Sequence, residues 1–228
     1  FHRYTQNNLD IVVGNRQLFL PSILLVVGKE KPEPAKDPEK VPALFQLMVL
    51  YHLERENIDG LTMQEIAEKL KTSYATVNRC VRWMKEKGFI TLNGGKEKQI
   101  SFNFQGKNLW TEALPFMETP IEFVVYTPEL AVSENSLISE QNALAEYSLL
   151  NGGPYRIAIS KEEYKKLNQK NIYWDPFGEA GIEVWKYDPT LLSDTGVVDK
   201  LSLYLLLKDY EDERVQIELE NMLNEIKW

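Results

Sequence analysis

Cysteine and histidine are scarce in this chain of 228 residues, and each scarcity excludes a kind of site. A single cysteine, Cys80, rules out a disulfide within the chain. The two histidines, His2 and His52, leave too few ligands for a zinc site built from cysteine and histidine. We therefore expect no metal site and no disulfide framework.

Long hydrophobic runs are also missing. The densest apolar run covers residues 23–27, and residues 41–53 are interrupted by Pro42 and His52, whereas a membrane helix needs about 20 apolar residues. No basic segment followed by an apolar one marks a signal peptide. These absences predict a soluble, cytoplasmic protein without membrane contact. Hydrophobic residues still make up 43% of the chain, which is enough for a substantial core.

Charge is present, but it is unevenly distributed along the chain. Residues 62–107 carry 9 basic and 4 acidic side chains, whereas residues 108–228 carry 10 basic and 22 acidic ones. The net charge of −8 therefore hides a basic segment followed by a strongly acidic half. A basic segment suits an anionic partner such as nucleic acid, and an acidic half would be repelled from it.

The pattern predicts an α/β (α+β) chain in three parts. Residues 1–40 read as a β-hairpin, with strands Leu9–Val13 and Gln17–Val27 and a turn at Gly14-Asn15, followed by the proline-rich linker Lys29–Lys40. Residues 41–107 read as three helices and a hairpin. Residues 108–228 read as a small acidic α/β domain. Its predicted elements are strands at 121–126, 155–160 and 182–187 and helices at 136–150, 162–168, 199–208 and 213–226.

Local signals fix the helices of the middle part. An apolar stripe predicts a helix over residues 41–56. Thr62 and Glu65 form a capping box that opens the next helix, and Ser73 begins a third helix that ends before Gly88. The spacing of Val77 and Val81 predicts that both lie on the buried side of the third helix. In this register Trp83 is expected to be exposed, which would suit an interface.

The line LTMQEIAEKLKTSYATVNRCVRWMKEKGFI, residues 61–90, resembles winged helix-turn-helix regulators of the MarR-like type. The resemblance implies a winged helix-turn-helix domain over residues 41–107. Its recognition helix, 74–87, would enter the major groove of double-stranded DNA, and its wing, 93–98, would contact the backbone or minor groove. The candidate DNA-binding residues are Lys71, Ser73, Tyr74, Thr76, Asn78, Arg79, Arg82, Lys85, Lys96 and Lys98.

These candidates have different expected roles. Arg79 is the best candidate for reading guanine, and Asn78 has the groups to read adenine. Ser73, Lys71 and Lys85 would hold phosphates. A regulator of this type is expected to be a homodimer that binds two half-sites about one helical turn apart.

The acidic half carries a second, shorter resemblance. The segments NALAEYSLL (142–150) and YRIAIS (155–160), after a winged helix, are similar to antitoxin regulators of the AbiEi kind. That resemblance implies an autorepressor with a toxin-like protein partner at the acidic domain.

No pattern in the acidic half predicts an enzyme or a cofactor site. The turn at 151–154 lacks the lysine of a phosphate-binding loop, and both histidines lie elsewhere. Asp175, Glu183 and Lys186 do not have nuclease spacing, since residues 183 and 186 point to opposite faces of a strand. One other function stays open: a winged-helix module that binds proteins rather than DNA, with the acidic half as a docking surface.

Overall fold

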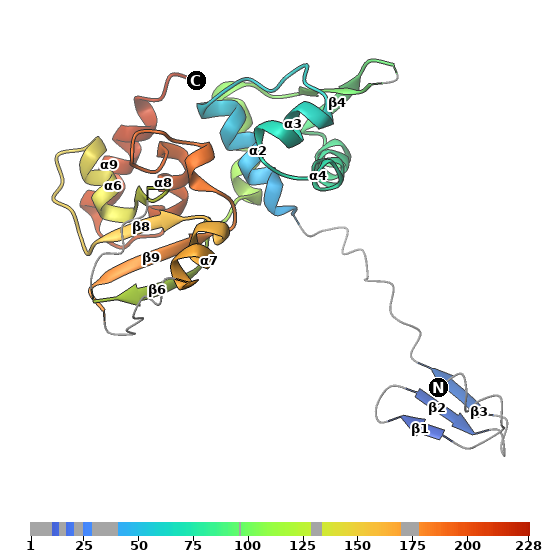
Figure 1. The fold of residues 1–228 in the computed structure, drawn as a ribbon. Helices are drawn as coiled ribbons and strands as arrows, with labels where there is room; N and C mark the ends of the chain where they lie inside the picture. Colours follow the sequence, from blue (N-terminus) through green and yellow to red (C-terminus); the bar gives the residue numbers. More distant parts are fainter. Residues whose placement is uncertain are drawn as a thin grey trace. The chain divides into compact units, whose positions relative to one another are not determined.

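A computed structural model describes residues 11–13, 17–20, 25–28, 41–95, 97–128, 134–169 and 178–228. Two compact units contain them, Phe1–Lys40 and Val41–Trp228 (Figure 1). None of the helices in these residues combines the length and the apolar character needed to cross a membrane.

The first unit contains a three-stranded antiparallel sheet of β1 (Ile11–Val13), β2 (Gln17–Leu20) and β3 (Leu25–Gly28). The predicted hairpin corresponds to β1 and β2. The prediction of one continuous strand over Gln17–Val27 is wrong, because β2 and β3 are two separate strands that pair antiparallel with each other. The predicted turn at 14–15 and linker at 29–40 lie outside the described residues.

The second unit begins with the predicted order of helices and hairpin. The elements are α2 (Ala43–Glu54), α3 (Met63–Lys69), α4 (Tyr74–Glu86), β4 (Ile90–Asn93) and β5 (Gln99–Phe102). The capping box at the start of α3 is confirmed, as is the Ser73 cap of α4. Gly88 has φ +79°, as expected for the residue that ends a helix in the left-handed conformation.

A four-stranded sheet follows, in the order β6-β9-β8-β7 (Figure 1). Its strands are β6 (Ile121–Thr127), β7 (Leu137–Ile138), β8 (Arg156–Ile159) and β9 (Ala180–Trp185). β8 and β9 are parallel, and the other pairs are antiparallel. The prediction of one helix over 136–150 is wrong at its start, because Leu137 and Ile138 pair with β8 before the helix begins.

Helices cover both faces of this sheet. Ile157, Ile159, Ile182 and Val184 cluster with Tyr164 and Leu167 of α7 (Lys161–Gln169) on one face. The alternate residues Ala158 and Trp185 belong to the main core on the other face. That core includes α6 (Glu140–Tyr147), α8 (Lys200–Leu207) and α9 (Glu213–Asn224). Asp188 and Asp199 cap short helices, whereas Asp175 lies outside the described residues.

The main core is continuous from α2 to α9 and extends across residue 107. The segment α5 (Gly106–Ala113) and the 3-10 helix η3 (Leu114–Phe116) leads from β5 into the acidic half. The prediction of a single apolar stripe on α2 was too narrow, since residues 45–50 are all buried. One reason is that Gln46 of α2 donates to the Tyr187 hydroxyl at 3.2 Å and accepts from the Glu118 backbone N–H at 3.2 Å. α2 therefore packs against both parts of the second unit.

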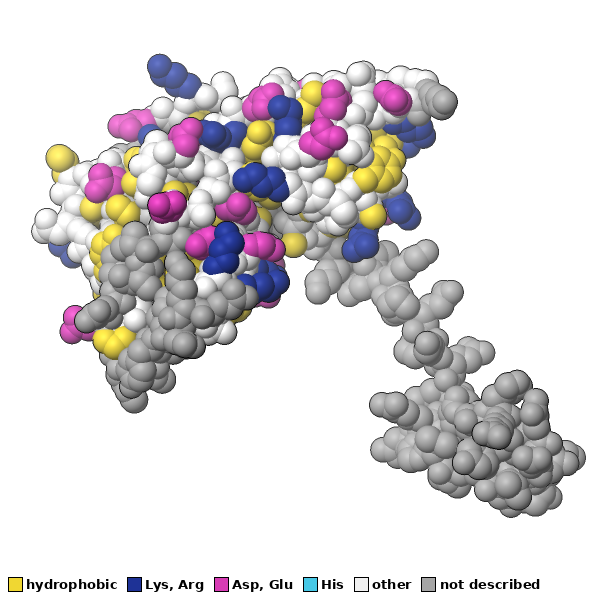
Figure 2. All heavy atoms as spheres, in the orientation of Figure 1, with side chains coloured by type: hydrophobic (Ala, Val, Ile, Leu, Met, Phe, Trp, Pro, Cys, Tyr) yellow, Lys and Arg dark blue, Asp and Glu magenta, His cyan; other side chains and the backbone are white. Residues whose placement is uncertain are grey.

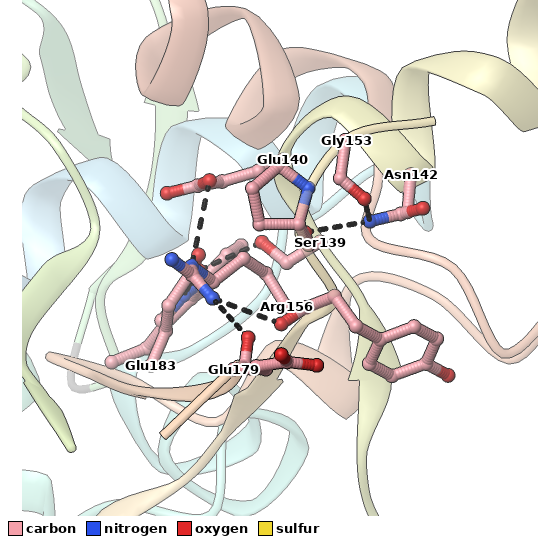
Figure 3. A network of polar contacts seen from close by, with 10 residues as sticks. Ser139, Glu140, Asn142, Gly153, Arg156, Glu179 and Glu183 are labelled. Carbon is pink, nitrogen blue, oxygen red and sulfur yellow. Dashed lines mark hydrogen bonds and ion pairs between the residues drawn. The ribbon is translucent and has the colours of Figure 1, made fainter. Parts of the chain in front are cut away.

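A buried polar network joins β7, α6, β8 and β9 (Figure 3). The Glu183 carboxyl, fully buried on β9, accepts from Ser139 Oγ at 2.7 Å and from Trp185 Nε1 at 3.0 Å, both through Oε2. Arg156 crosses the sheet to the Glu140 carboxylate, at 3.8 Å, and to backbone carbonyls. Burial, together with the nearby Glu140 carboxylate, raises the pKa of Glu183 to about 8. Glu183 therefore keeps its proton at neutral pH.

Candidate nucleic-acid interface

α3 and α4 pack closely through small and β-branched side chains. Ala67, Val77 and Val81 are all buried, as the sequence predicted for the two valines. The turn between them is closed by the Thr72 N–H, which donates to the Ala67 carbonyl at 2.9 Å. Lys71 in this turn has φ +49°, which is uncommon for a residue with a side chain.

This packing leaves the opposite side of α4 facing solvent. Among the predicted DNA-binding residues, Lys71, Ser73, Tyr74, Arg79, Arg82, Lys85 and Lys98 are exposed, and Thr76 and Asn78 are half-buried. Lys96 lies outside the described residues. Figure 2 shows Lys and Arg side chains on the side of the unit that carries α4 and the β4–β5 hairpin, with an apolar patch between them.

Five of these residues line one groove between α4 and the hairpin. The groove has a volume of about 820 Å³, and the five are Tyr74, Asn78, Arg82, Lys85 and Lys98. Met63, Val81 and Leu92 supply apolar walls. The groove thus combines cationic groups with an exposed aromatic ring, a composition that fits a sugar-phosphate strand.

Lys71 and Thr76 lie elsewhere, on a second cleft of about 570 Å³ that faces the acidic half. Its other wall includes Ser160, Glu163 and Lys166. The Thr76 hydroxyl also bonds to Ser73 Oγ at 2.8 Å, so these two side chains hold the first turn of α4 together. The described part of the predicted set is therefore divided: five residues line the groove, Lys71 and Thr76 line the second cleft, and the exposed Ser73 and Arg79 line neither hollow.

The groove also contains two acidic residues, Glu65 and Glu97. Hydrogen bonds from the Thr62 backbone N–H and hydroxyl to the Glu65 carboxylate lower the pKa of that carboxyl. Glu65 is therefore ionised at neutral pH. An anionic strand in the groove must lie nearer to Arg82 and Lys85 than to this carboxylate.

The prediction that Trp83 is exposed is wrong. Its side chain is only 6% exposed and packs against Phe45 of α2, with ring centroids 4.9 Å apart. Phe89 and Phe116 complete the cluster, at 6.1 and 5.6 Å from the Trp83 ring. The ring is buried because Phe116, from the segment after α5, folds back onto α4. Cys80 is buried as predicted, and burial raises the pKa of its thiol to about 12.

Comparison with known proteins agrees with this geometry. Residues 47–91 match the family model described as winged helix-turn-helix DNA-binding. This segment is a winged helix-turn-helix DNA-binding domain. No curated protein and no solved structure is similar enough to the chain to be matched. The comparisons thus assign the DNA-binding domain and support a DNA-binding regulator.

The wing of this winged-helix domain is the β4–β5 hairpin, which continues beyond the matched segment. Ile90 pairs with Phe102 and Asn93 with Gln99. Gly94 has φ +91°, and a Cβ at this position would lie 2.8 Å from the Glu97 carbonyl oxygen. The wing therefore requires glycine at residue 94.

Sequence reasoning missed part of the groove in the winged-helix domain. Met63 and Gln64, in the first turn of α3, line it together with Leu92 of the wing. They lie beside the wing because Thr62 pairs with Gln99 and the Gly60 N–H donates to the Ile100 carbonyl at 2.8 Å. The capping box at Thr62 located the first turn of α3, but no local pattern gave its distance from the wing.

Proposed function

We propose that this protein is a sequence-specific, DNA-binding transcriptional regulator. α4 enters the major groove, and the wing, residues 93–98, lies on the backbone or minor groove. The supporting observation is the exposed side of α4, which carries Arg79, Arg82 and Lys85 within a winged-helix DNA-binding domain. A DNA-binding domain of this kind favours a regulator rather than an enzyme.

In this proposal the residues of α4 divide the work of recognition. Arg79 donates two hydrogen bonds to a guanine edge, and Asn78 reads adenine. Lys71, Ser73 and Lys85 hold phosphates on the flanks, and Lys96 and Lys98 hold the strand at the wing. Tyr74, Thr76 and Arg82 complete the contact surface.

Three finer features belong to the same proposal. The protein acts as a homodimer, so that two copies of α4 reach half-sites about one helical turn apart. It is an antitoxin-type autorepressor with a toxin-like protein partner on the acidic half. It works in the cytoplasm, where a bacterial-type regulator meets DNA. The acidic half, with 22 acidic and 10 basic residues, supports this arrangement because DNA repels it toward the outer side of the complex.

Binding to a fluorescent library of upstream DNA tests the proposal. If Lys71, Lys85, Lys96 and Lys98 each neutralise one phosphate, affinity should fall roughly 150-fold between about 50 and 200 mM salt. Arg79→Ala should lose sequence preference, with a loss of about 1–3 kcal/mol on the preferred site. Arg214→Ala is the matched control, since Arg214 is an exposed arginine held by Asp212 on α9, outside the proposed interface.

The result that would overturn the proposal is an absence of DNA binding at the lower salt concentration. Equal losses in Arg79→Ala and Arg214→Ala would show that charge alone, and not α4, carries the binding. Either outcome would favour the alternative function, a winged-helix module that binds proteins through the acidic half.

A further inference from the structure

Three large apolar side chains are exposed around one end of the acidic half. Leu149, in the turn after α6, is fully exposed, and Ile217 on α9 is 51% exposed. Tyr210, just before α9, is 44% exposed. Single exposed apolar side chains are common, but several on one surface are typical of a site that binds another molecule.

These residues belong to one surface. Leu149 and Arg214, in the first turn of α9, line the same hollow of about 450 Å³. Ile217 is three residues after Arg214 and therefore shares its side of the helix. Gln216 Nε2 donates to the Tyr210 carbonyl at 2.7 Å, which fixes Tyr210 beside the start of α9. We call Leu149, Tyr210, Arg214 and Ile217 the α9 surface.

The α9 surface lies in the most acidic stretch of the chain. Residues 209–225 carry seven acidic side chains, and their single basic one is Arg214. Asp212 neutralises Arg214 through two hydrogen bonds, of 3.2 and 2.8 Å. The exposed carboxylates around Ile217, such as Glu213 and Glu220, thus have no basic residue within this stretch left to balance them.

This charge decides which kind of molecule can cover the apolar side chains. DNA and anionic membranes are repelled. A second copy docked symmetrically is disfavoured, because a two-fold contact would bring the same acidic stretch of both copies together. A protein segment with basic residues beside an apolar face meets both requirements. The exposed side of α9 is long enough for a second helix to pack along it.

We propose that the α9 surface binds a basic amphipathic helix of a partner protein, with Leu149 and Ile217 as its apolar anchors. This inference rests on the partner role proposed for the acidic half. It is independent of DNA binding by α4. The two apolar anchors fix where the partner helix binds. The carboxylates raise its association rate and select for a basic partner.

The test uses a defined probe, a fluorescent helical peptide of about 18 lysine, leucine and alanine residues with one apolar face. A second peptide has the same composition in an order that has no apolar face. Both are titrated with the full chain, with the double variant Leu149→Ser/Ile217→Ser, and with Phe123→Ser. Phe123 is a matched control because it is 39% exposed on β6, away from α9.

We expect the amphipathic peptide to bind the unchanged chain at least about 10-fold more tightly than the reordered peptide, and to lose about 10-fold in affinity with the double variant. Phe123→Ser should bind it as the unchanged chain does. The proposal is overturned by no binding at about 50 mM salt, by equal binding of both peptides, or by equal losses in both variants.

Sedimentation of the chain without peptide completes the test. Self-association that the double variant abolishes would assign the α9 surface to a second copy and would overturn the proposal. All substituted residues are exposed, so circular dichroism should show unchanged folding. The double variant should still bind DNA like the unchanged chain, so failure of the peptide experiment is distinguishable from failure of the proposed function.

Discussion

Replacing Glu183 by glutamine should make the protein more stable at neutral pH, although it removes a fully buried, hydrogen-bonded carboxyl group. In the folded chain Glu183 holds its proton up to a pKa of about 8, whereas its ordinary value is 4.5. The unfolded chain releases this proton at lower pH than the folded chain does. Folding at pH 7 therefore requires proton uptake, and the unchanged protein loses stability as the pH rises.

The size of the effect follows from the linkage of proton binding to folding. Between pH 4.5 and about 8 the free energy of unfolding should fall by about 1.4 kcal/mol per pH unit on account of Glu183. Over the interval from 4.5 to 7 this amounts to about 3 kcal/mol. Glutamine keeps an oxygen for the donors on Ser139 and Trp185, and its amide N–H₂ replaces the carboxyl proton. The substitution removes the titration, and the amide nitrogen takes the place of Oε1, a buried atom for which the described residues offer no hydrogen-bond partner.

Urea unfolding followed by far-UV circular dichroism measures the free energy of unfolding of both proteins. The measurement is repeated at steps of about half a pH unit between about pH 5.5 and 8.5. Glu183→Gln should lose much less stability across this range than the unchanged chain, and the two curves should diverge as the pH rises. Glu179→Gln, at an exposed neighbour, should run parallel to the unchanged chain. Parallel curves for Glu183→Gln and the unchanged chain would refute the reasoning.

Two further substitutions test the winged-helix domain. Trp83→Ala should lower the free energy of unfolding by about 3–5 kcal/mol, because it empties the centre of an aromatic cluster. Urea unfolding measures this loss, and a loss below about 1 kcal/mol would contradict the burial of Trp83. Gly94→Ala should destabilise the wing by about 1–3 kcal/mol through its positive φ and the clash with the Glu97 carbonyl. The same variant should bind DNA several-fold more weakly. Amide hydrogen exchange should become faster in the wing alone, and unchanged exchange there would contradict the requirement for glycine at residue 94.

The local signals in the sequence predicted most of the winged-helix domain. Capping residues such as Thr62 and Ser73 act within a few residues of themselves, so their effects are readable from the chain alone. The positions of Val77 and Val81 likewise predicted which side of α4 is buried and which side is exposed. The roles of Arg79 and Asn78 in reading bases stay predictions.

The errors occurred where distant segments decide the environment. Trp83 reads as exposed on α4 alone and is buried by Phe116, which folds back from beyond the wing. Leu137 has the spacing of a helix, yet pairing with Ala158 places it in a strand. Helical and strand patterns compete within such short apolar stretches, and pairing with a distant strand is not encoded locally. The Glu183 network was missed for the same reason, since its members come from separate elements.

The position of α2 has a consequence for how separable the two halves of this protein are. Consecutive residues of α2 face opposite neighbours: Phe45 packs on Trp83 of α4, and Gln46 bonds to Tyr187 of the acidic half. The family match begins at residue 47 and therefore leaves both residues outside. Excising the matched segment would remove packing that α4 depends on, and exchanging the acidic half would expose the other side of α2. A rearrangement of the acidic half would therefore act directly on α2, the helix that packs against α4.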